Sequence, residues 1–289
     1  MHILLLFSVG IIATCGLIYE LAAGTLASYL LGDSVTQFST IIGVYLFSMG
    51  IGSFLSRYVR SYVLDVFVQV EIIVGIIGGI SSALLFVLFP HIESFRVVLY
   101  AIVTLTGIFV GLEIPLLMNI LRQHIEFRDM VSRVFSYDYA GALLASVIFP
   151  LLMVPYLGLV RTSFAFGSLN VAVALLLSIV LAKELHFART LQGQSAVVLV
   201  LLLAGIYFSE NIVTQAEQNI YGENIIYSTS SPYQRIVLTR HRKAIKLYLN
   251  NNLQFSSADE YRYHEALVHP AMCLHSTPPR KIAVLGGGD

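Results

Sequence analysis

Long apolar runs separated by short polar connections fill the chain before residue 210. An α-helix needs roughly 20 mainly apolar residues to cross the hydrocarbon core of a bilayer. We therefore predict a helical multi-pass membrane domain over residues 1–213, with six or seven transmembrane helices. A seventh run, 196–208, reaches spanning length only by taking in residues 209–213, which include Glu210. The other six runs are 3–21, 38–55, 66–89, 97–121, 139–156 and 163–182.

The composition agrees with a membrane protein and excludes some other classes. Of 289 residues, 57% are hydrophobic and only 12% are charged, whereas soluble domains carry about 25% charged residues. A formal net charge of zero argues against a nucleic-acid surface. Cys15 and Cys273 are too few and too distant to predict a disulfide framework or a metal site. No Lys or Arg precedes the first run, so we expect no cleaved signal peptide.

Positive charge is concentrated in alternate connections. The first, third and fifth connections carry only Arg96 and Arg161. Because Lys and Arg are enriched in cytoplasmic loops, we expect the N-terminus on the cytoplasmic side of a bacterial inner membrane. Six crossings leave the tail inside, which we expect, and seven place it outside. The other connections carry Arg57, Arg60, Arg122, Arg128, Arg133, Lys183 and Arg189.

Three acids, Glu20, Glu71 and Glu113, lie in or near the apolar runs. Because an ionised acid in lipid costs several kcal/mol, such residues face a bundle interior or a partner. Glu113 precedes Pro115, whose missing N–H frees a carbonyl one turn back. The acids either pair with an Arg or a Tyr hydroxyl and join helices, or they form a site for a cation or a proton. Glu71 has a third interpretation, a position at the membrane interface without a function.

Small residues within the runs predict close helix packing. They are Gly50, Gly52, Gly75, Gly78 and Gly79.

The tail has a different pattern. Short runs at 225–227, 235–239 and 244–249, separated by Ser-Pro and by a basic turn at 240–243, predict a small antiparallel sheet with a hairpin. Residues 258–275 predict a helix that Pro270 ends or kinks. After Pro278-Pro279, residues 282–285 predict a strand. We divide the tail into a β-rich domain, 219–280, and the first strand of a Rossmann-like α/β domain, 281–289.

Two motifs in the tail suggest ligands. His264 and His269 are five residues apart, so on a helix their rings point roughly 140° apart, and a zinc site is not predicted. Gly286, Gly287 and Gly288 with Asp289 follow an apolar run, as in a nucleotide- or adenosyl-binding turn, although a plain turn has the same pattern. The polar stretch 259–265 is either a solvated helix start or a face that closes over an amine.

These residues resemble the polyamine aminopropyltransferases, the spermidine synthases. The resemblance is carried by Tyr233-Gln234-x-Ile236, by LQFSSADEYRYHEALVHPAM, which begins at Leu253, and by the GGGD ending. Stretches 19–39, 111–117 and 138–163 are similar to the N-terminal domain of the membrane-fused bacterial members. The resemblance covers nearly the whole chain.

The resemblance implies a reaction and a set of binding residues. The family transfers the aminopropyl group of decarboxylated S-adenosylmethionine, a co-substrate and not a cofactor, to putrescine. It implies that Gln234 contacts the adenosyl donor and that Gln254 contacts its ribose. Tyr263 and His264 then lie at the aminopropyl arm and the acceptor side, and Asp289 fixes the aminopropyl amine.

Two departures from the family pattern limit this interpretation. Asn250-Asn251 replaces Asp-Gly in a tight turn, which Asn tolerates. The catalytic aspartates are expected beyond residue 289, so we expect the chain to be inactive alone, either as a truncated product or as half of a split enzyme completed by a second chain. A homo-oligomer is a further expected partner. The alternatives are a membrane module that binds or transports polyamines and a non-catalytic membrane anchor.

Overall fold

The computed structural model describes all residues except 1, 123–124, 232–233, 275–279 and 284–289, and it leaves out the side chains of residues 2, 3 and 230. The chain forms two compact units, Met1–Ile220 and Tyr221–Asp289. The first is helical, and the second contains a small sheet and one helix.

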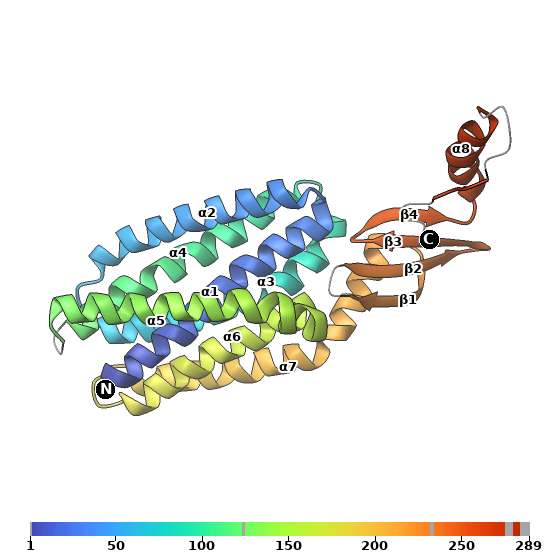
Figure 1. Ribbon diagram of the computed structural model, residues 1–289. Helices are drawn as coiled ribbons and strands as arrows, with labels where there is room; N and C mark the ends of the chain where they lie inside the picture. Colours follow the sequence, from blue (N-terminus) through green and yellow to red (C-terminus); the bar gives the residue numbers. More distant parts are fainter. Residues whose placement is uncertain (1, 123–124, 232–233, 275–279, 284–289) are drawn as a thin grey trace. The chain divides into compact units, whose positions relative to one another are not determined.

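Successive long helices of the first unit run in alternating directions (Figure 1). The first helix therefore starts at one end of the unit and the seventh finishes at the other. A π-turn, Phe149–Met153, follows the fifth helix, and single 3₁₀ turns follow the second and third. The helices are α1 (His2–Leu31), α2 (Ser34–Leu55), α3 (Val63–Leu88), α4 (Phe95–Leu121), α5 (Phe127–Ile148), α6 (Val154–Val180) and α7 (Ala188–Tyr221).

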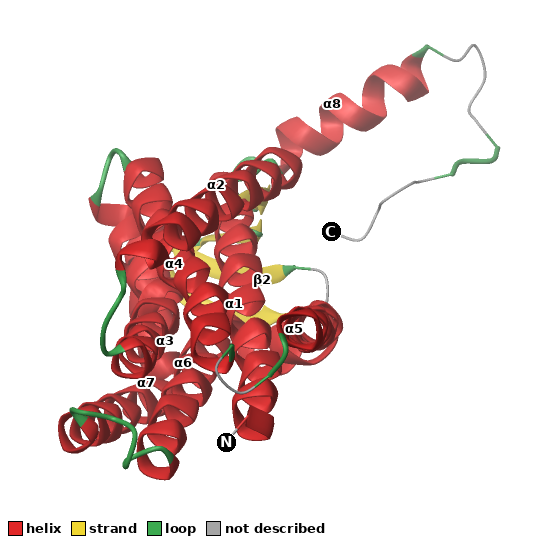
Figure 2. Cartoon of the chain, turned by 90° about the vertical axis from the view of Figure 1, so that its left-hand side faces the viewer, coloured by secondary structure: helices red, strands yellow, loops and turns green. Residues whose placement is uncertain are grey.

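Helix α1 is the centre of this unit. It contacts α2, α3, α4, α5 and α6, and the view along the bundle shows it surrounded by them (Figure 2). Leu5, Ile18 and Leu26 on α1 are fully buried. A helix that is apolar on all sides is buried in this way, because no face of it favours water.

Glycines bring α2 and α4 close together. A Cβ atom on Gly52 would clash with the carbonyl of Ile108, and one on Gly111 would clash with the backbone of Met49. The absence of these side chains therefore sets the distance between the two helices. The predicted packing role is confirmed for Gly52, whereas Gly50 faces open space.

The same kind of contact joins α3 to α6. A Cβ on Gly75 would lie 3.0 Å from the carbonyl oxygen of Gly167, and one on Gly79 would lie 3.2 Å from the Cα of Gly167. Gly78 packs instead against the ring of Tyr19 on α1. The predicted packing roles of these three glycines are confirmed.

Six segments of the described chain are long and apolar enough to cross a membrane. One of them, Phe127–Val180, has 54 residues. As a straight helix it would measure about 80 Å, more than twice the thickness of a hydrocarbon core. It contains both α5 and α6, which run in opposite directions (Figure 1), with a break at Gly158, whose φ is 72°. The segment therefore supplies two of the seven helices.

The short seventh apolar run lies within α7, which has 34 residues. The helix continues through Glu210, whose carboxylate accepts a hydrogen bond from Arg161 on α6 at 2.9 Å. Arg161 also donates to the hydroxyl of Ser209 at 3.1 Å. Arg161 therefore gives the carboxylate of Glu210 a charged partner beside the apolar run.

The second unit contains an antiparallel four-stranded sheet in the order β1-β2-β3-β4. The predicted sheet and hairpin are confirmed, while the fourth strand was not predicted. Two-residue turns join the last three strands, and Arg242, Asn250 and Asn251 have positive φ there. The expectation that Asn250-Asn251 supports a tight turn is confirmed. The strands are β1 (Asn224–Ser230), β2 (Arg235–His241), β3 (Ala244–Leu249) and β4 (Asn252–Ser256).

Helix α8 (Glu260–Cys273) follows the sheet, and the predicted helix is confirmed. Pro270 lies inside α8 and does not end it. None of the α8 residues is buried. The strand expected at 282–285 falls mostly outside the described residues, and residues 281–283 are not in a strand.

Glu223 ties three segments of the second unit together at the start of β1. Its carboxylate accepts hydrogen bonds from Lys246 Nζ and from the Thr239 hydroxyl, each at 2.6 Å. The bond from Lys246 and then the bond from Thr239 lower the pKa of Glu223, and the bond to Glu223 raises the pKa of Lys246. Such bonds stabilise the ionised forms.

We predict that Gly52→Leu destabilises the helical unit by about 1–3 kcal/mol, because the new side chain forces α2 away from α4. Thermal unfolding of the detergent-solubilised chain measures this change. Gly50→Leu on the same helix is the control, since a Cβ there meets open space. Equal effects of the two substitutions would contradict the packing argument.

We predict that Glu223→Gln lowers the stability of the sheet by about 1 kcal/mol at pH 7, the usual size for such bonds. Because the pKa of Glu223 is lowered by folding, its contribution is present above the ordinary Glu pKa of about 4.3 and is lost as the pH falls through the folded value. The difference between variant and parent should therefore shrink in acid. Hydrogen exchange of the strand amides measures it, with Glu265→Gln on exposed α8 as the control.

Candidate functional site

Gln234 lies just before β2. Its backbone N–H donates to the Ser231 hydroxyl at 3.0 Å, and the Ser231 N–H donates to the Gln234 carbonyl at 2.9 Å. These bonds close the connection from β1. The side chain of Asn250 fixes the next residue, because its Oδ1 accepts from the Arg235 N–H at 2.9 Å. Asn250 also donates its backbone N–H to the Arg235 carbonyl at 3.0 Å, so the Asn-Asn turn supports the start of β2.

Gln254 lies on β4 at an irregularity of the sheet. Leu253 pairs with Tyr248 and Phe255 pairs with Leu247, so Gln254 is the additional residue of a β-bulge. Bulges redirect a side chain and are frequent beside active sites. Gln254 is exposed to solvent.

Tyr263 and His264 lie side by side on α8. Their rings are 5.4 Å apart in an edge-to-face arrangement. His264 Nδ1 is 4.0 Å from Oε1 of Glu260, one turn earlier. Tyr263 is 62% exposed, so its hydroxyl and ring face are free to contact a ligand. An aromatic face beside a carboxylate is suited to a cationic amine.

The structure describes only part of the predicted ligand-binding set. Gln234 and Gln254 flank the same sheet, and Tyr263 and His264 adjoin on one helix. Gly286, Gly287, Gly288 and Asp289 lie outside the described residues.

Glu71 on α3 is fully buried inside the helical unit. The Asn170 side chain on α6 donates to the Glu71 carboxylate at 3.0 Å and to its backbone carbonyl at 2.9 Å. Glu71 therefore joins α3 to α6, with an amide as its partner in place of the expected Arg or Tyr.

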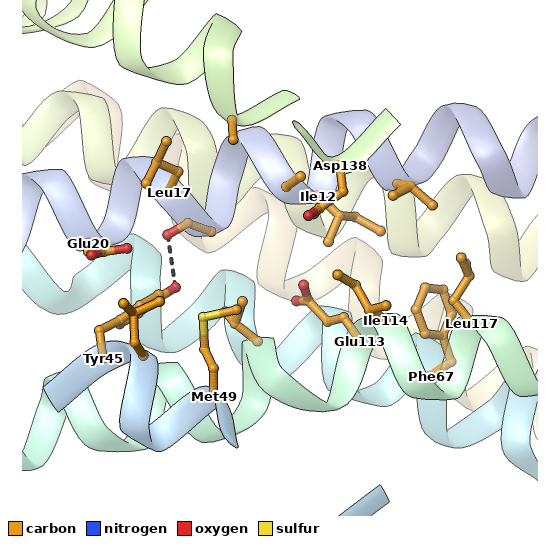
Figure 3. A pocket seen from close by; sticks show the side chains of 16 residues that line it. Ile12, Leu17, Glu20, Tyr45, Met49, Phe67, Glu113, Ile114, Leu117 and Asp138 are labelled. Carbon is orange, nitrogen blue, oxygen red and sulfur yellow. Dashed lines mark hydrogen bonds between the residues drawn. The ribbon is translucent and has the colours of Figure 1, made fainter. Parts of the chain in front are cut away.

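Glu20 and Glu113 line one cavity of about 180 Å³ in the helical unit, together with Asp138 of α5 (Figure 3). Glu20 is 8% exposed and Glu113 is 4% exposed. Near them the Tyr45 hydroxyl donates to the carbonyl of Gly16 at 2.9 Å. The two predicted acids thus face the same cavity, one from α1 and one from α4.

Sequence reasoning missed Asp138 because it lies at the edge of an apolar run, next to Tyr139. The spacing of the residues could have indicated its position, because Asp138, Gly141 and Ala145 are three and four residues apart. Such residues share one helix face. Gly141 and Ala145 are buried in the structure, so this face of α5 packs inside the unit.

The chain therefore has two units. An apolar helical bundle comes first, and a small sheet with a helix that carries exposed polar and aromatic side chains follows it. No family model matches the chain. No solved structure matches it significantly.

Curated relatives match the chain along its length. A polyamine aminopropyltransferase of Leptospira interrogans (strain Fiocruz L1-130) is 53% identical over 289 residues, which are 100% of this chain and 58% of the relative. Polyamine aminopropyltransferase 2 of Ralstonia nicotianae is 52% identical over 99% of this chain and 57% of the relative. A polyamine aminopropyltransferase of Oceanobacillus iheyensis is 40% identical over 98% of this chain and 56% of the relative.

The chain is therefore a member of the polyamine aminopropyltransferase family, and the resemblance drawn from its motifs is confirmed. It spans less than two thirds of the length of these relatives.

Proposed function

We propose that this chain is part of an enzyme that transfers the aminopropyl group of decarboxylated S-adenosylmethionine to putrescine, giving spermidine and methylthioadenosine. The identity of 53% along the whole chain to a curated polyamine aminopropyltransferase carries this proposal. The described geometry supports it, because Tyr263 and the bulged Gln254 offer exposed groups for a polar, cationic ligand, and the half-buried His264 adjoins Tyr263.

The proposed roles of the residues follow from the family resemblance. Gln234 contacts the adenosyl part of the donor, and Gln254 contacts its ribose. Tyr263 and His264 line the aminopropyl arm, and Asp289 holds the amine. The carboxylates that position and deprotonate the acceptor are proposed to come from the part of the relatives that residues 1–289 do not match.

We further propose that the apolar helices span the inner membrane of a bacterium. In the most apolar 18-residue stretch of α7, only 11% is buried inside the protein, and in that of Phe127–Val180 only 17% is buried. Most of these apolar side chains therefore have no protein partner, which supports contact with lipid. The ion pair between Arg161 and Glu210 follows directly on the apolar run of α7, as charged groups near an interface do.

For the activity, we predict that a fragment of residues 1–289 forms no spermidine by itself. Together with the part of the Leptospira relative that it does not match, it should convert putrescine and decarboxylated S-adenosylmethionine to spermidine and methylthioadenosine, measured by mass spectrometry. His264→Ala should lower this rate at least tenfold, about 1.4 kcal/mol. His269→Ala on the same helix is the matched control and should leave the rate unchanged.

Two outcomes of this assay would contradict the proposal. Turnover by the chain alone would show that the catalytic acids are already present. No turnover after the two parts are shown to co-purify would contradict the reaction itself.

For the topology, we propose that the second unit faces the cytoplasm, where a charged sulfonium donor that cannot cross lipid unaided is made available. A reporter that is active only in the cytoplasm, fused after Asp289, should therefore be active. Activity of a reporter specific for the periplasm would contradict this side. With seven crossings, a cytoplasmic second unit places the N-terminus and the cationic connections on the periplasmic side, opposite to the orientation expected from Lys and Arg. Periplasmic activity of the reporter would therefore favour the orientation expected from these charges.

A further inference from the structure

A cavity within the helical unit gathers carboxyl groups from three helices. Glu20 belongs to α1, Glu113 to α4 and Asp138 to α5, and all three line the same space of about 180 Å³. This is more than ten times the volume of about 10–15 Å³ that a single water needs. No Lys, Arg or His lines the cavity among the described residues. Three acids thus share a space to which the described chain brings no positive charge.

Glu113 supplies an independent sign of a missing ligand. Its side chain is 96% buried, since it is 4% exposed, and within the described part of the chain its Oε1 has no hydrogen-bond partner. Leaving a buried acceptor unpaired costs about 1–3 kcal/mol, and more when it is charged. Figure 3 shows the carboxyl groups of Glu113 and Asp138 pointing toward one another across the cavity. A cation bound between them removes this cost.

The other residues that line the cavity indicate which kind of cation fits it. The wall is apolar between the acids, with side chains such as Ile12, Leu17 and Met49. Ca²⁺ and Mg²⁺ require about six or more oxygen ligands at close range. The described residues contain no group of three His, Cys, Asp or Glu side chains that is placed to hold a metal ion. An organic cation with an apolar body fits this wall better than a metal ion does.

The position of Glu20 indicates a cation at each end. Gly141, one turn after Asp138, packs against Ala13 of α1. From Ala13 to Glu20 the helix rises about 10 Å. Glu20 lies toward Tyr45, away from the pair of facing carboxyls (Figure 3). One ammonium group cannot contact both sites, whereas an extended chain with an amine at each end can.

We propose that this cavity binds an unbranched aliphatic α,ω-diamine as its dication. One ammonium lies between Glu113 and Asp138, the methylene chain lies along Ile12 and Leu17, and the second ammonium lies at Glu20. Alkyl amines are protonated at neutral pH, as the Lys pKa of about 10.4 indicates. The site is separate from the C-terminal unit and does not depend on the transferase activity.

The test is calorimetric titration of the full chain in detergent with 1,4-diaminobutane, and with butylamine as the probe that has one amine. The parent chain should bind the diamine at least tenfold more tightly than the monoamine. Glu113→Gln should weaken both ligands at least tenfold. Glu20→Gln should weaken the diamine and leave butylamine unchanged. Glu93→Gln, which alters an exposed acid outside the cavity, is the matched control and should bind as the parent does.

Several results would overturn the proposal. One is diamine binding that survives both Glu113→Gln and Asp138→Asn, and another is an equal affinity for the two amines. Binding lost in His264→Ala but kept in Glu113→Gln would assign the diamine to the C-terminal unit. Circular dichroism measures whether each variant keeps the helical content of the parent. If Glu113→Gln does not fold, Asp138→Asn and Glu20→Gln provide the comparison. Failure of the transfer assay leaves this result unaffected, because the titration requires no turnover.

Discussion

A carboxyl group inside an apolar bundle must find a partner, and this requirement explains much of the helical unit. Glu71 is satisfied in part by Asn170, which fixes α3 against α6. The glycines Gly75, Gly79 and Gly167 bring the same two helices close enough for that bond to form. Glu113 has no such partner on Oε1 among the described residues, and a cavity lies beside it. Burying a carboxyl group without a partner is unfavourable. Close helix packing brings a partner to Glu71, whereas the cavity leaves room for a ligand beside Glu113.

Much of the helical unit could be predicted from the sequence, because the length and apolarity of a run are local properties. The runs, the packing glycines Gly52 and Gly79, and the acids Glu20 and Glu113 were all found in this way. The full length of α7 was not, because its two ends, 188–195 and 214–221, are mainly polar and lie outside the apolar run. Asp138 was missed for a similar reason: its importance comes from side chains on other helices.

In the second unit, turn chemistry was predictable and the detailed pairing was not. Asn250 and Asn251 adopt the left-handed conformation that their residue type allows. Strand β4 and the bulge at Gln254 depend on pairing with β3, and a run of five residues gives a weak local signal. The bonds of Glu223 join residues far apart in the chain, so no spacing in the sequence indicated them.

The two cysteines differ in exposure, so one native thiol can serve as a site for chemical labelling. Cys15 is fully buried on central α1, while Cys273 is exposed at the end of α8. A thiol reagent that cannot cross lipid should therefore modify one position only, without any engineered cysteine. Applied to intact cells and to inverted vesicles, it distinguishes the two compartments, and a fluorophore at the same sulfur reports when a ligand or a second chain covers α8.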